Sequence, residues 1–370
     1  MSSSPFGVGF IGAGNVLPAY LQVLDRMVPR GQAREGPICA RERETWPELL
    51  RRRPGARLVE HVEEVLESDV DIVVVVTPPD SHCELARRAL EHGKHVVVEK
   101  PFAASRVEGE ELVALAADRG RHVLAAPFVQ LAPTFRALWT IVSDGEIGHV
   151  HSARGLYGNA GSHWTTWYHS GGPGPLGEAG IYNLKSLTAL LGPVVEVLAV
   201  EGLAVFRRQA GGVELESPDP DVSHVVIRHA RGALSSIVSS QAIQRYRRPA
   251  LELYGTEGTV NLLGDDWDPR GFEVWRNATG SWEEHESIEP TWLWADGLRE
   301  AVAALREGRE PLQSLEQDLH LLDVIEAARR SVADGAVVSV TSTFEPLDLR
   351  LERPTGVEHL HDHTRPADEQ

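Results

Sequence analysis

A glycine-rich stretch near the start of the chain decides the fold class: Gly9-Phe10-Ile11-Gly12-Ala13-Gly14-Asn15. Residues 6–11 form an apolar run that is typical of a short buried strand, and residues 16–28 have the pattern of a helix. A strand, a glycine turn and a helix in this order are the first unit of a dinucleotide-binding fold.

The glycines of this turn have separate tasks. Gly12 permits the tight turn, and Gly14 lets the backbone approach a pyrophosphate. Free N–H groups of the helix that begins near Asn15 are expected to hold that pyrophosphate. Leu17 stands where the usual fingerprint has its third glycine. Because many glycine turns bind nothing, the prediction also depends on the segments that follow.

The rest of the first third alternates between buried strands and helices. The apolar run 71–76 ends at Thr77-Pro78-Pro79, and a second run, 95–98, ends at Glu99-Lys100-Pro101. Strands of this composition are buried on both faces in a parallel sheet covered by helices. Further elements are expected at 81–92 and 107–119, both helical, and at 123–126, a strand. The pattern predicts a doubly wound Rossmann sheet.

Beyond residue 126 the pattern changes to longer strands joined by turns. Strands are expected at 148–157, 194–206, 223–230, 232–240 and 250–254, and helices at 134–143, 180–191, 294–306 and 314–334. We therefore predict an α/β protein with two domains: a dinucleotide-binding Rossmann domain at 1–126, and at 127–345 an α+β domain with a large, mostly antiparallel, open-faced sheet. Because an open sheet face commonly packs against the same face of a second copy of the chain, we expect a homodimer or homotetramer.

Residues 346–370 are expected to form a disordered tail. The tail carries His359, His361 and His363, which alternate along the chain. We interpret them as solvated side chains rather than as metal ligands, and we predict no metal site.

Composition excludes several classes of partner. The net charge is −18, which repels phosphate backbones and anionic membranes, so neither nucleic acid nor a membrane is expected as a partner. No apolar window is long enough to span a bilayer, and the N-terminus lacks the pattern of a signal peptide. Cys39 and Cys83 are interpreted as reduced, buried thiols. These features predict a cytoplasmic protein.

The residues after the second expected strand, 36–40, bear on the choice of cofactor. The local sequence is Cys39-Ala40-Arg41-Glu42-Arg43, in which Ala40 occupies the slot where an acid would bond the ribose 2′-OH of NAD. Arg41 suits the 2′-phosphate of NADP, whereas a shift of one or two residues would put Glu42 in the slot. Both charges also suit an ordinary exposed loop. The pattern leaves NAD and NADP open and leans toward NADP.

Lys100 follows a buried strand at the carboxyl edge of the sheet, where ligands bind in folds of this kind. A lysine at this edge can hydrogen-bond a substrate hydroxyl and stabilise developing alkoxide charge. A surface lysine after a strand is the alternative interpretation.

A second constellation lies in a glycine- and proline-rich loop that runs from Gly171 into a helix. Glu178 and Tyr182 are four residues apart and are expected to share a helix face, and Lys185 borders Tyr182. A nearby cation favours the phenolate of a tyrosine, which would make Tyr182 a better base. The alternative is a half-buried helix aromatic beside a solvated lysine.

Four side chains upstream of this loop form an aromatic and polar cluster: His163, Trp164, Trp167 and His169. Rings with polar tips in loops are suited to holding a sugar ring, so we predict substrate contacts there. The same residues are equally suited to capping the sheet.

The combined pattern resembles the glucose–fructose oxidoreductase, inositol dehydrogenase and MocA (Gfo/Idh/MocA) family. The resemblance rests on the glycine turn, on Thr77-Pro78-Pro79-Asp80-Ser81-His82, on Glu99-Lys100-Pro101, on the loop and helix that reach Tyr182, and on Gly255-Thr256-Glu257-Gly258-Thr259. It covers the chain except for the tail. It implies a Rossmann domain followed by an open-faced sheet domain, and oxidation of a sugar or cyclitol alcohol with NAD or NADP.

The resemblance also implies residue roles. Lys100 matches the family's catalytic lysine, and Tyr182 matches its general acid/base position. Glu178 matches a position usually held by aspartate, so its role is open. Lys185 replaces a polar substrate-binding residue, which implies a different substrate contact or a tuning of Tyr182. The cofactor contacts implied or predicted are Gly9, Gly12, Gly14, Asn15, Arg41, Thr77, Pro78, Glu99 and Lys100.

These observations predict an NAD(P)-dependent dehydrogenase or ketoreductase that transfers hydride between the nicotinamide and a secondary alcohol or ketone of a sugar or cyclitol. Two alternatives stay open. One is a redox-neutral glycosidase or epimerase that retains its NAD and oxidises its substrate transiently. The other is a non-catalytic, cofactor-binding sensor.

Overall fold

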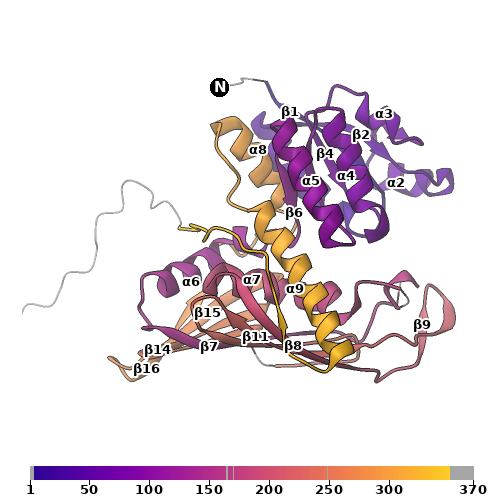
Figure 1. Ribbon diagram of the computed structural model, residues 1–370. Coiled ribbons are helices and arrows are strands. Elements are labelled where there is room, and N and C mark those ends of the chain that lie inside the picture. The colour runs from indigo at the N-terminus through magenta and orange to yellow at the C-terminus, as the bar shows by residue number, and fades with distance from the viewer. Residues whose placement is uncertain (1–3, 164–165, 170, 248, 351–370) are drawn as a thin grey trace, which may run out of the picture.

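The computed structural model describes residues 4–163, 166–169, 171–247 and 249–350, apart from the side chain of Trp167. The chain builds two large sheets, one above the other in Figure 1, and long helix α9 (Leu315–Asp334) runs between them. Within the described part of the chain, no helix combines the length and apolar character needed to cross a membrane.

The first sheet is parallel and has six strands in the order β3-β2-β1-β4-β5-β6. Its strands are β1 (Phe6–Ile11), β2 (Ala33–Cys39), β3 (Leu58–Val59), β4 (Ile72–Val75), β5 (His95–Val98) and β6 (Val123–Ala125). The chain adds β2 and β3 on one side of β1 and then crosses to add β4, β5 and β6 on the other side. This switch point opens a crevice at the carboxyl ends of the strands, where nucleotides bind in such folds. The predicted Rossmann sheet is confirmed.

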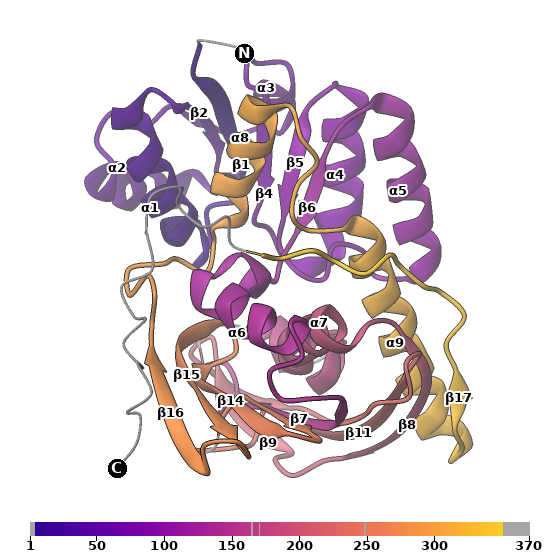
Figure 2. The ribbon, with the colours of Figure 1, turned by 90° about the vertical axis from the view of Figure 1, so that its left-hand side faces the viewer.

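Helices cover both faces of this sheet (Figure 2). They are α1 (Leu17–Met27), α2 (Trp46–Arg52), α3 (Glu63–Leu66), α4 (His82–Glu91) and α5 (Arg106–Arg119). One face packs on α1 and also on α8 (Gly297–Glu307), whose Leu298, Ala301 and Val302 are buried in the same core as Tyr20. A segment from the C-terminal half of the chain therefore completes the first core.

The second sheet has nine strands in the order β16-β15-β14-β13-β7-β12-β11-β8-β17. They are β7 (Val150–Gly158), β8 (Val194–Gly202), β11 (Val222–His229), β12 (Leu234–Ser240), β13 (Leu251–Gly255), β14 (Gly258–Asp265), β15 (Asp268–Arg276), β16 (Ser281–Glu286) and β17 (Val338–Ser339). All neighbours are antiparallel except β7 and β12. The large, mostly antiparallel sheet is therefore confirmed, and β13 and β14 form a hairpin within it.

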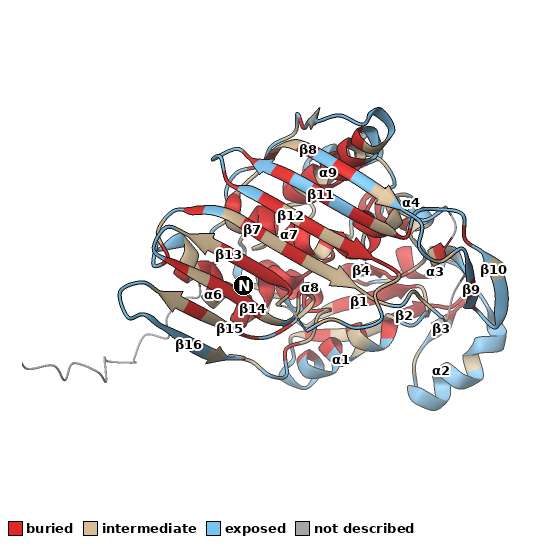
Figure 3. Cartoon of the chain, turned by 90° about the horizontal axis from the view of Figure 1, so that it is seen from below, coloured by how far each residue is buried: buried red, intermediate tan, exposed pale blue. Residues whose placement is uncertain are grey.

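Helices α6 (Pro133–Ser143) and α7 (Ile181–Leu191) lie with α9 between this sheet and the Rossmann domain, as Figure 2 shows. None of the helices in the described part of the chain covers the opposite face of the sheet (Figure 3). A separate hairpin of β9 (Arg207–Ala210) and β10 (Val213–Glu216) was not expected from the sequence, because each strand has only four residues and such a short pattern does not identify a strand.

The predicted tail begins too early. Leu349 is fully buried, and Arg136 of α6 donates to its backbone oxygen at 2.8 Å, so residues 346–350 still pack on the second domain. His359, His361 and His363 lie outside the described residues.

The prediction for Lys185 is corrected by the structure. This side chain is completely buried inside the second domain, where its ammonium group pairs with Asp318 of α9. Gln317, also on α9, donates to the backbone oxygen of Lys185 at 3.2 Å. The residue therefore joins α7 to α9, and its ammonium group is directed to Asp318 rather than to Tyr182 because a buried cation needs a partner of opposite charge.

We expect Lys185→Met to lower the free energy of unfolding by about 3–5 kcal/mol, because it leaves the Asp318 carboxylate buried without its cation. The double variant Lys185→Met/Asp318→Leu should recover most of that loss, since it removes both charges together. Guanidinium-induced unfolding measures both changes. A single variant as stable as the double one would show that the pair does not hold the two helices together.

Candidate active site

A cavity of about 990 Å³ lies between the carboxyl ends of the Rossmann strands and the second domain. Its lining extends from Arg41 after β2, past the glycine turn after β1, to Lys100 after β5, and includes Glu178 and Tyr182 of the second domain. Residues far apart in the sequence thus meet in one elongated site of a size suited to a dinucleotide and a small substrate.

The glycine turn faces this cavity through Gly12, Ala13, Gly14 and Asn15. Gly12 has a φ of 108°, and a Cβ there would lie 2.7 Å from the backbone oxygen of Val76, so only glycine fits without strain. A Cβ on Gly14 would meet no protein atom within 4 Å. The space in front of Gly14 therefore stays open to a ligand.

Gly9 has a different task from the predicted one. It lies within β1 and is not among the residues that line the cavity. A Cβ there would lie 2.7 Å from Cγ1 of Val65, on α3. Gly9 therefore allows close packing of α3 on the sheet rather than contact with a cofactor.

Arg41 and Glu42 both lie on the lining at the end of β2. Their side chains are 88% and 69% exposed, and the closest guanidinium and carboxylate atoms are 4.0 Å apart. Trp46 donates to the backbone oxygen of Ala40 at 2.7 Å and fixes the turn that carries them. Since neither charge is committed to a buried partner, both are available to a ribose or its 2′-phosphate.

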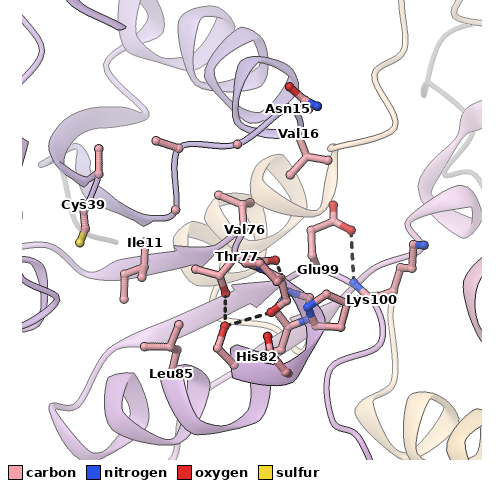
Figure 4. Close-up of a pocket in the computed structure, with 18 of the residues that line it drawn as sticks. Ile11, Asn15, Val16, Cys39, Val76, Thr77, His82, Leu85, Glu99 and Lys100 are labelled. Atoms are coloured by element: carbon pink, nitrogen blue, oxygen red, sulfur yellow. Dashed lines mark hydrogen bonds between the residues drawn. The ribbon is translucent and has the colours of Figure 1, made fainter. Parts of the chain in front are cut away.

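The turn after β4 also borders the cavity, through Thr77 and Pro78. The buried imidazole of His82 joins this turn to the one after β5: Nε2 lies 2.7 Å from the backbone oxygen of Thr77, and Nδ1 lies 2.8 Å from that of Pro101 (Figure 4). Ser81 donates to the hydroxyl of Thr77 at 2.8 Å. These contacts hold two strand ends in register at the cavity floor.

Glu99 and Lys100 leave β5 in different directions. The Glu99 carboxylate accepts the backbone N–H of Lys100 at 3.2 Å and the hydroxyl of Tyr20, on α1, at 2.8 Å. The Lys100 side chain extends away from that carboxylate, as Figure 4 shows. Its Nζ donates to Oε1 of Glu178 at 2.5 Å and to the backbone oxygen of Glu178 at 2.9 Å. The ammonium group is therefore held at the second domain.

Glu178 lies in a π-helical turn, Leu176–Gly180, that leads directly into α7. Tyr182 stands in the first turn of α7 and lines the cavity together with Glu178. The ammonium group of Lys100 lies 5.6 Å from the centre of the Tyr182 ring, and the ring of Tyr157 stacks on Tyr182 with centroids 5.4 Å apart. The predicted trio of Lys100, Glu178 and Tyr182 thus meets at one point.

The protonation state of Tyr182 differs from the expectation. Burial raises the pKa of Tyr182 well above its usual value, and the neighbouring Tyr157, Glu99 and Glu178 add to the shift. The expected stabilisation of the phenolate by Lys185 is absent, because that ammonium group is bound to Asp318. Tyr182 is therefore a neutral phenol near pH 7.

The predicted cluster upstream of this loop is not part of the described lining. His163 is exposed. His169 is buried, with Nε2 at 2.6 Å from the backbone oxygen of Ser162, so it holds its own loop together. Trp164 and the side chain of Trp167 lie outside the described residues.

Three aromatic residues of the lining escaped the sequence reasoning: Tyr157, Trp267 and Trp294. Tyr157 sits inside β7, where an alternating strand pattern does not distinguish a ligand-facing ring from a core ring. Trp267 stands between aspartates in a tight turn. A large aromatic residue in such a turn is a signal that could have been noticed.

Comparison with known proteins agrees with this geometry. Residues 6–126 match the model of an oxidoreductase family with an NAD-binding Rossmann fold, and residues 135–261 match the GFO/IDH/MocA C-terminal domain. The trans-1,2-dihydrobenzene-1,2-diol dehydrogenase of Bos taurus is 26% identical over 266 residues, which cover 70% of this chain and 75% of the bovine one.

The levoglucosan dehydrogenase of Pseudarthrobacter phenanthrenivorans is 27% identical over 56% of this chain and 62% of its own. A solved levoglucosan dehydrogenase, in complex with NADH and L-sorbose, superposes with a TM-score of 0.79 at 20% identity and covers 92% of this chain and 100% of its own. With its Rossmann and C-terminal domains both matched, the chain belongs to the GFO/IDH/MocA family of NAD-binding oxidoreductases.

Proposed function

We propose that this oxidoreductase transfers hydride between a nicotinamide cofactor and a secondary alcohol or ketone of a sugar or cyclitol. One observation carries the proposal: the ammonium group of Lys100 and the ring of Tyr182 meet at one end of a cavity that is also lined by the glycine turn. The levoglucosan and dihydrodiol dehydrogenase relatives support the same class of substrate.

The lining fits the cofactor. Gly12, Gly14 and Asn15 would hold the pyrophosphate, and Thr77 and Pro78 would border the nicotinamide half. When bound there, the nicotinamide supplies the hydride acceptor or donor. Asn15 and the open space at Gly14 also leave the N-terminus of α1 accessible to an anion.

Lys100, Tyr182 and Glu178 have separate roles in the proposed reaction. Lys100 polarises the reacting oxygen and stabilises its negative charge, since an ammonium group in a poorly solvated site acts strongly on a developing alkoxide. Tyr182 exchanges the hydroxyl proton with that oxygen. Glu178 positions Lys100 by accepting two contacts from it, one through its carboxylate and one through its backbone oxygen.

A second copy of the chain is proposed to cover the open face of the large sheet, as a homodimer or homotetramer. Exposed apolar side chains lie on three adjacent strands toward the β17 edge of the sheet: Leu198 and Val200 of β8, Val226 of β11 and Leu234 of β12. Figure 3 shows exposed stretches along β8 and β11 on this face. Exposed apolar surface of this kind marks protein interfaces. Sedimentation equilibrium tests the proposal. A measured mass of 40.6 kDa, which is the mass of one chain, would contradict it.

A cytoplasmic location is also proposed. Cys39 and Cys83 are free thiols, and burial raises the pKa of both to about 11, so they stay protonated near neutral pH. Fractionation of the producing cells tests this location, and recovery of the protein outside the cytoplasm would contradict it.

We expect Lys100→Met to lower kcat by about 10²–10³-fold and to leave the Kd of the dinucleotide nearly unchanged, because one electrostatic donor is lost from the reacting oxygen. Steady-state kinetics and cofactor titration measure the two quantities. Lys94→Met is the matched control: the Lys94 ammonium group binds the backbone oxygens of Ser68 and Val70, away from the cavity. Activity within a few-fold of wild type would remove Lys100 from the mechanism.

Tyr182→Phe should fold, bind the cofactor and lose roughly 10²–10⁴-fold in turnover, since the ring remains and only the exchangeable proton is gone. Tyr157→Phe is the matched control because its ring stacks on Tyr182 in the same lining. Loss of turnover in the Tyr157 variant alone would transfer the proton role to Tyr157.

The raised pKa of Tyr182 sets a sign for the pH dependence. Below that pKa the phenolate fraction grows about tenfold per pH unit, whereas the neutral phenol dominates throughout. We therefore expect kcat/KM for alcohol oxidation to rise with pH between about 6 and 9, and kcat/KM for ketone reduction to stay flat. Oxidation that is independent of pH over this range would contradict Tyr182 as the base.

We also propose that the enzyme prefers NADP to NAD and that Arg41 causes this preference. We expect Arg41→Ala to raise the KM for NADPH far more than the KM for NADH, because the 2′-phosphate, present in NADPH alone, loses a charge-assisted hydrogen bond. Glu42→Ala is the matched control and should affect NADH more if Glu42 holds the ribose. Equal effects of Arg41→Ala on both cofactors would assign Arg41 to the loop surface.

A further inference from the structure

The turn between β14 and β15 presents a tryptophan to the reacting end of the cavity. Asp265 and Asp268 are paired across the hairpin, so Asp266 and Trp267 are the two middle residues of the turn. Trp267 is half-buried and lines the main cavity together with Lys100, Glu178 and Tyr182. It also lines a small adjoining cavity, which it shares with Trp294.

This turn is anchored to the helix that carries Tyr182. The carboxylate of Asp266 is completely buried and accepts a hydrogen bond from Nδ2 of Asn183 at 2.6 Å and another from Oγ of Ser186 at 2.7 Å. Both donors belong to α7, and Asn183 is the next residue after Tyr182. The position of Trp267 is thereby linked to that of the proton-exchanging phenol.

The buried carboxylate that anchors this turn lowers the stability of the fold. The two donors to Asp266 are neutral groups, and burial raises the pKa of this carboxyl to about 6. Removing a carboxylate from water without a cation beside it opposes folding. A turn held only for stability would be served better by an apolar residue. The arrangement instead fixes the direction of a side chain that faces the site.

We propose that Trp267 is a specificity-determining residue, an aromatic platform on which the apolar C–H face of a cyclic substrate packs, and that Asp266 is its positioning residue. The inference rests on the proposed sugar or cyclitol oxidoreduction and adds a selection for rings over open-chain polyols.

Two physical reasons support a ring. The C–H face of a ring is flat enough to cover the indole and to exclude water from both surfaces. A ring is also preorganised, whereas an open-chain polyol must give up several freely rotating bonds to present the same face. The platform therefore favours the ring mainly through binding, while the chemistry at Lys100 and Tyr182 is common to both.

The test compares ring and open-chain alcohols with the full-length enzyme. Levoglucosan and myo-inositol are the cyclic probes, sorbitol and xylitol are the open-chain probes, and both NAD and NADP are supplied. Wild type should have the higher kcat/KM for a cyclic probe. Trp267→Ala should raise the KM for that probe by about tenfold or more, as truncation of a buried aromatic contact does, with little change for the open-chain probes and for the cofactor.

Two further variants separate the platform from general damage. Trp267→Phe keeps an aromatic face and should stay within a few-fold of wild type. Trp282→Ala removes a tryptophan that is 49% exposed on β16 and does not line the cavity, so it should change nothing. An equal effect of Trp267→Ala on ring and open-chain probes, or no effect on either, would overturn the platform.

Asp266 is tested by the same selectivity ratio. Asp266→Ala should lower the preference for rings and leave the KM for the cofactor unchanged, whereas Asp266→Asn, which keeps one acceptor for α7, should retain most of the preference. A loss of kcat for every probe with no change in preference would make Asp266 a structural residue only. A wild type that turns over none of the probes would instead overturn the proposed function itself.

Discussion

The contact between Lys100 and Glu178 is the interaction on which the reacting end of the site depends. These residues are 78 positions apart and belong to different domains, yet the ammonium group reaches both the carboxylate and the backbone oxygen of Glu178. The contact requires that the carboxyl end of β5 and the start of α7 face each other at hydrogen-bonding distance. The packing of the two domains therefore determines the geometry of the proposed catalytic residues.

Chain segments that return from the C-terminal half keep the domains in this relation. Helix α8 completes the core on one face of the Rossmann sheet. Gln313, just before α9, donates to the backbone oxygens of Ala125 and Pro127, at the point where the chain leaves the Rossmann domain. Because these buried hydrogen bonds join backbone to side chain across the boundary, neither domain is free to tilt without leaving polar groups unpaired.

Helix α7 is the structural centre of the second domain because each side of it has a different partner. Tyr182 faces the cavity, Asn183 and Ser186 hold the β14–β15 turn, and Lys185 pairs with Asp318 on α9. Nearly the whole helix is buried, so its polar side chains must all find partners within the protein. The position of the phenol is thus fixed from three directions, and its burial keeps it protonated.

The sequence by itself determined the Rossmann sheet and the change to an antiparallel sheet after residue 126. It also singled out Lys100, Glu178 and Tyr182, which line one cavity in the structure. These features depend on local patterns: continuous apolar runs, a glycine turn, and a strand that ends in Glu99-Lys100-Pro101. Only the tertiary structure decided the partner of Lys185, the packing task of Gly9, the structural task of His169 and the presence of Trp267 in the site. Each of these depends on contacts between segments distant in sequence. The type of a residue and its neighbours in the chain do not specify which side chain lies opposite it in the folded protein, nor whether water reaches that residue.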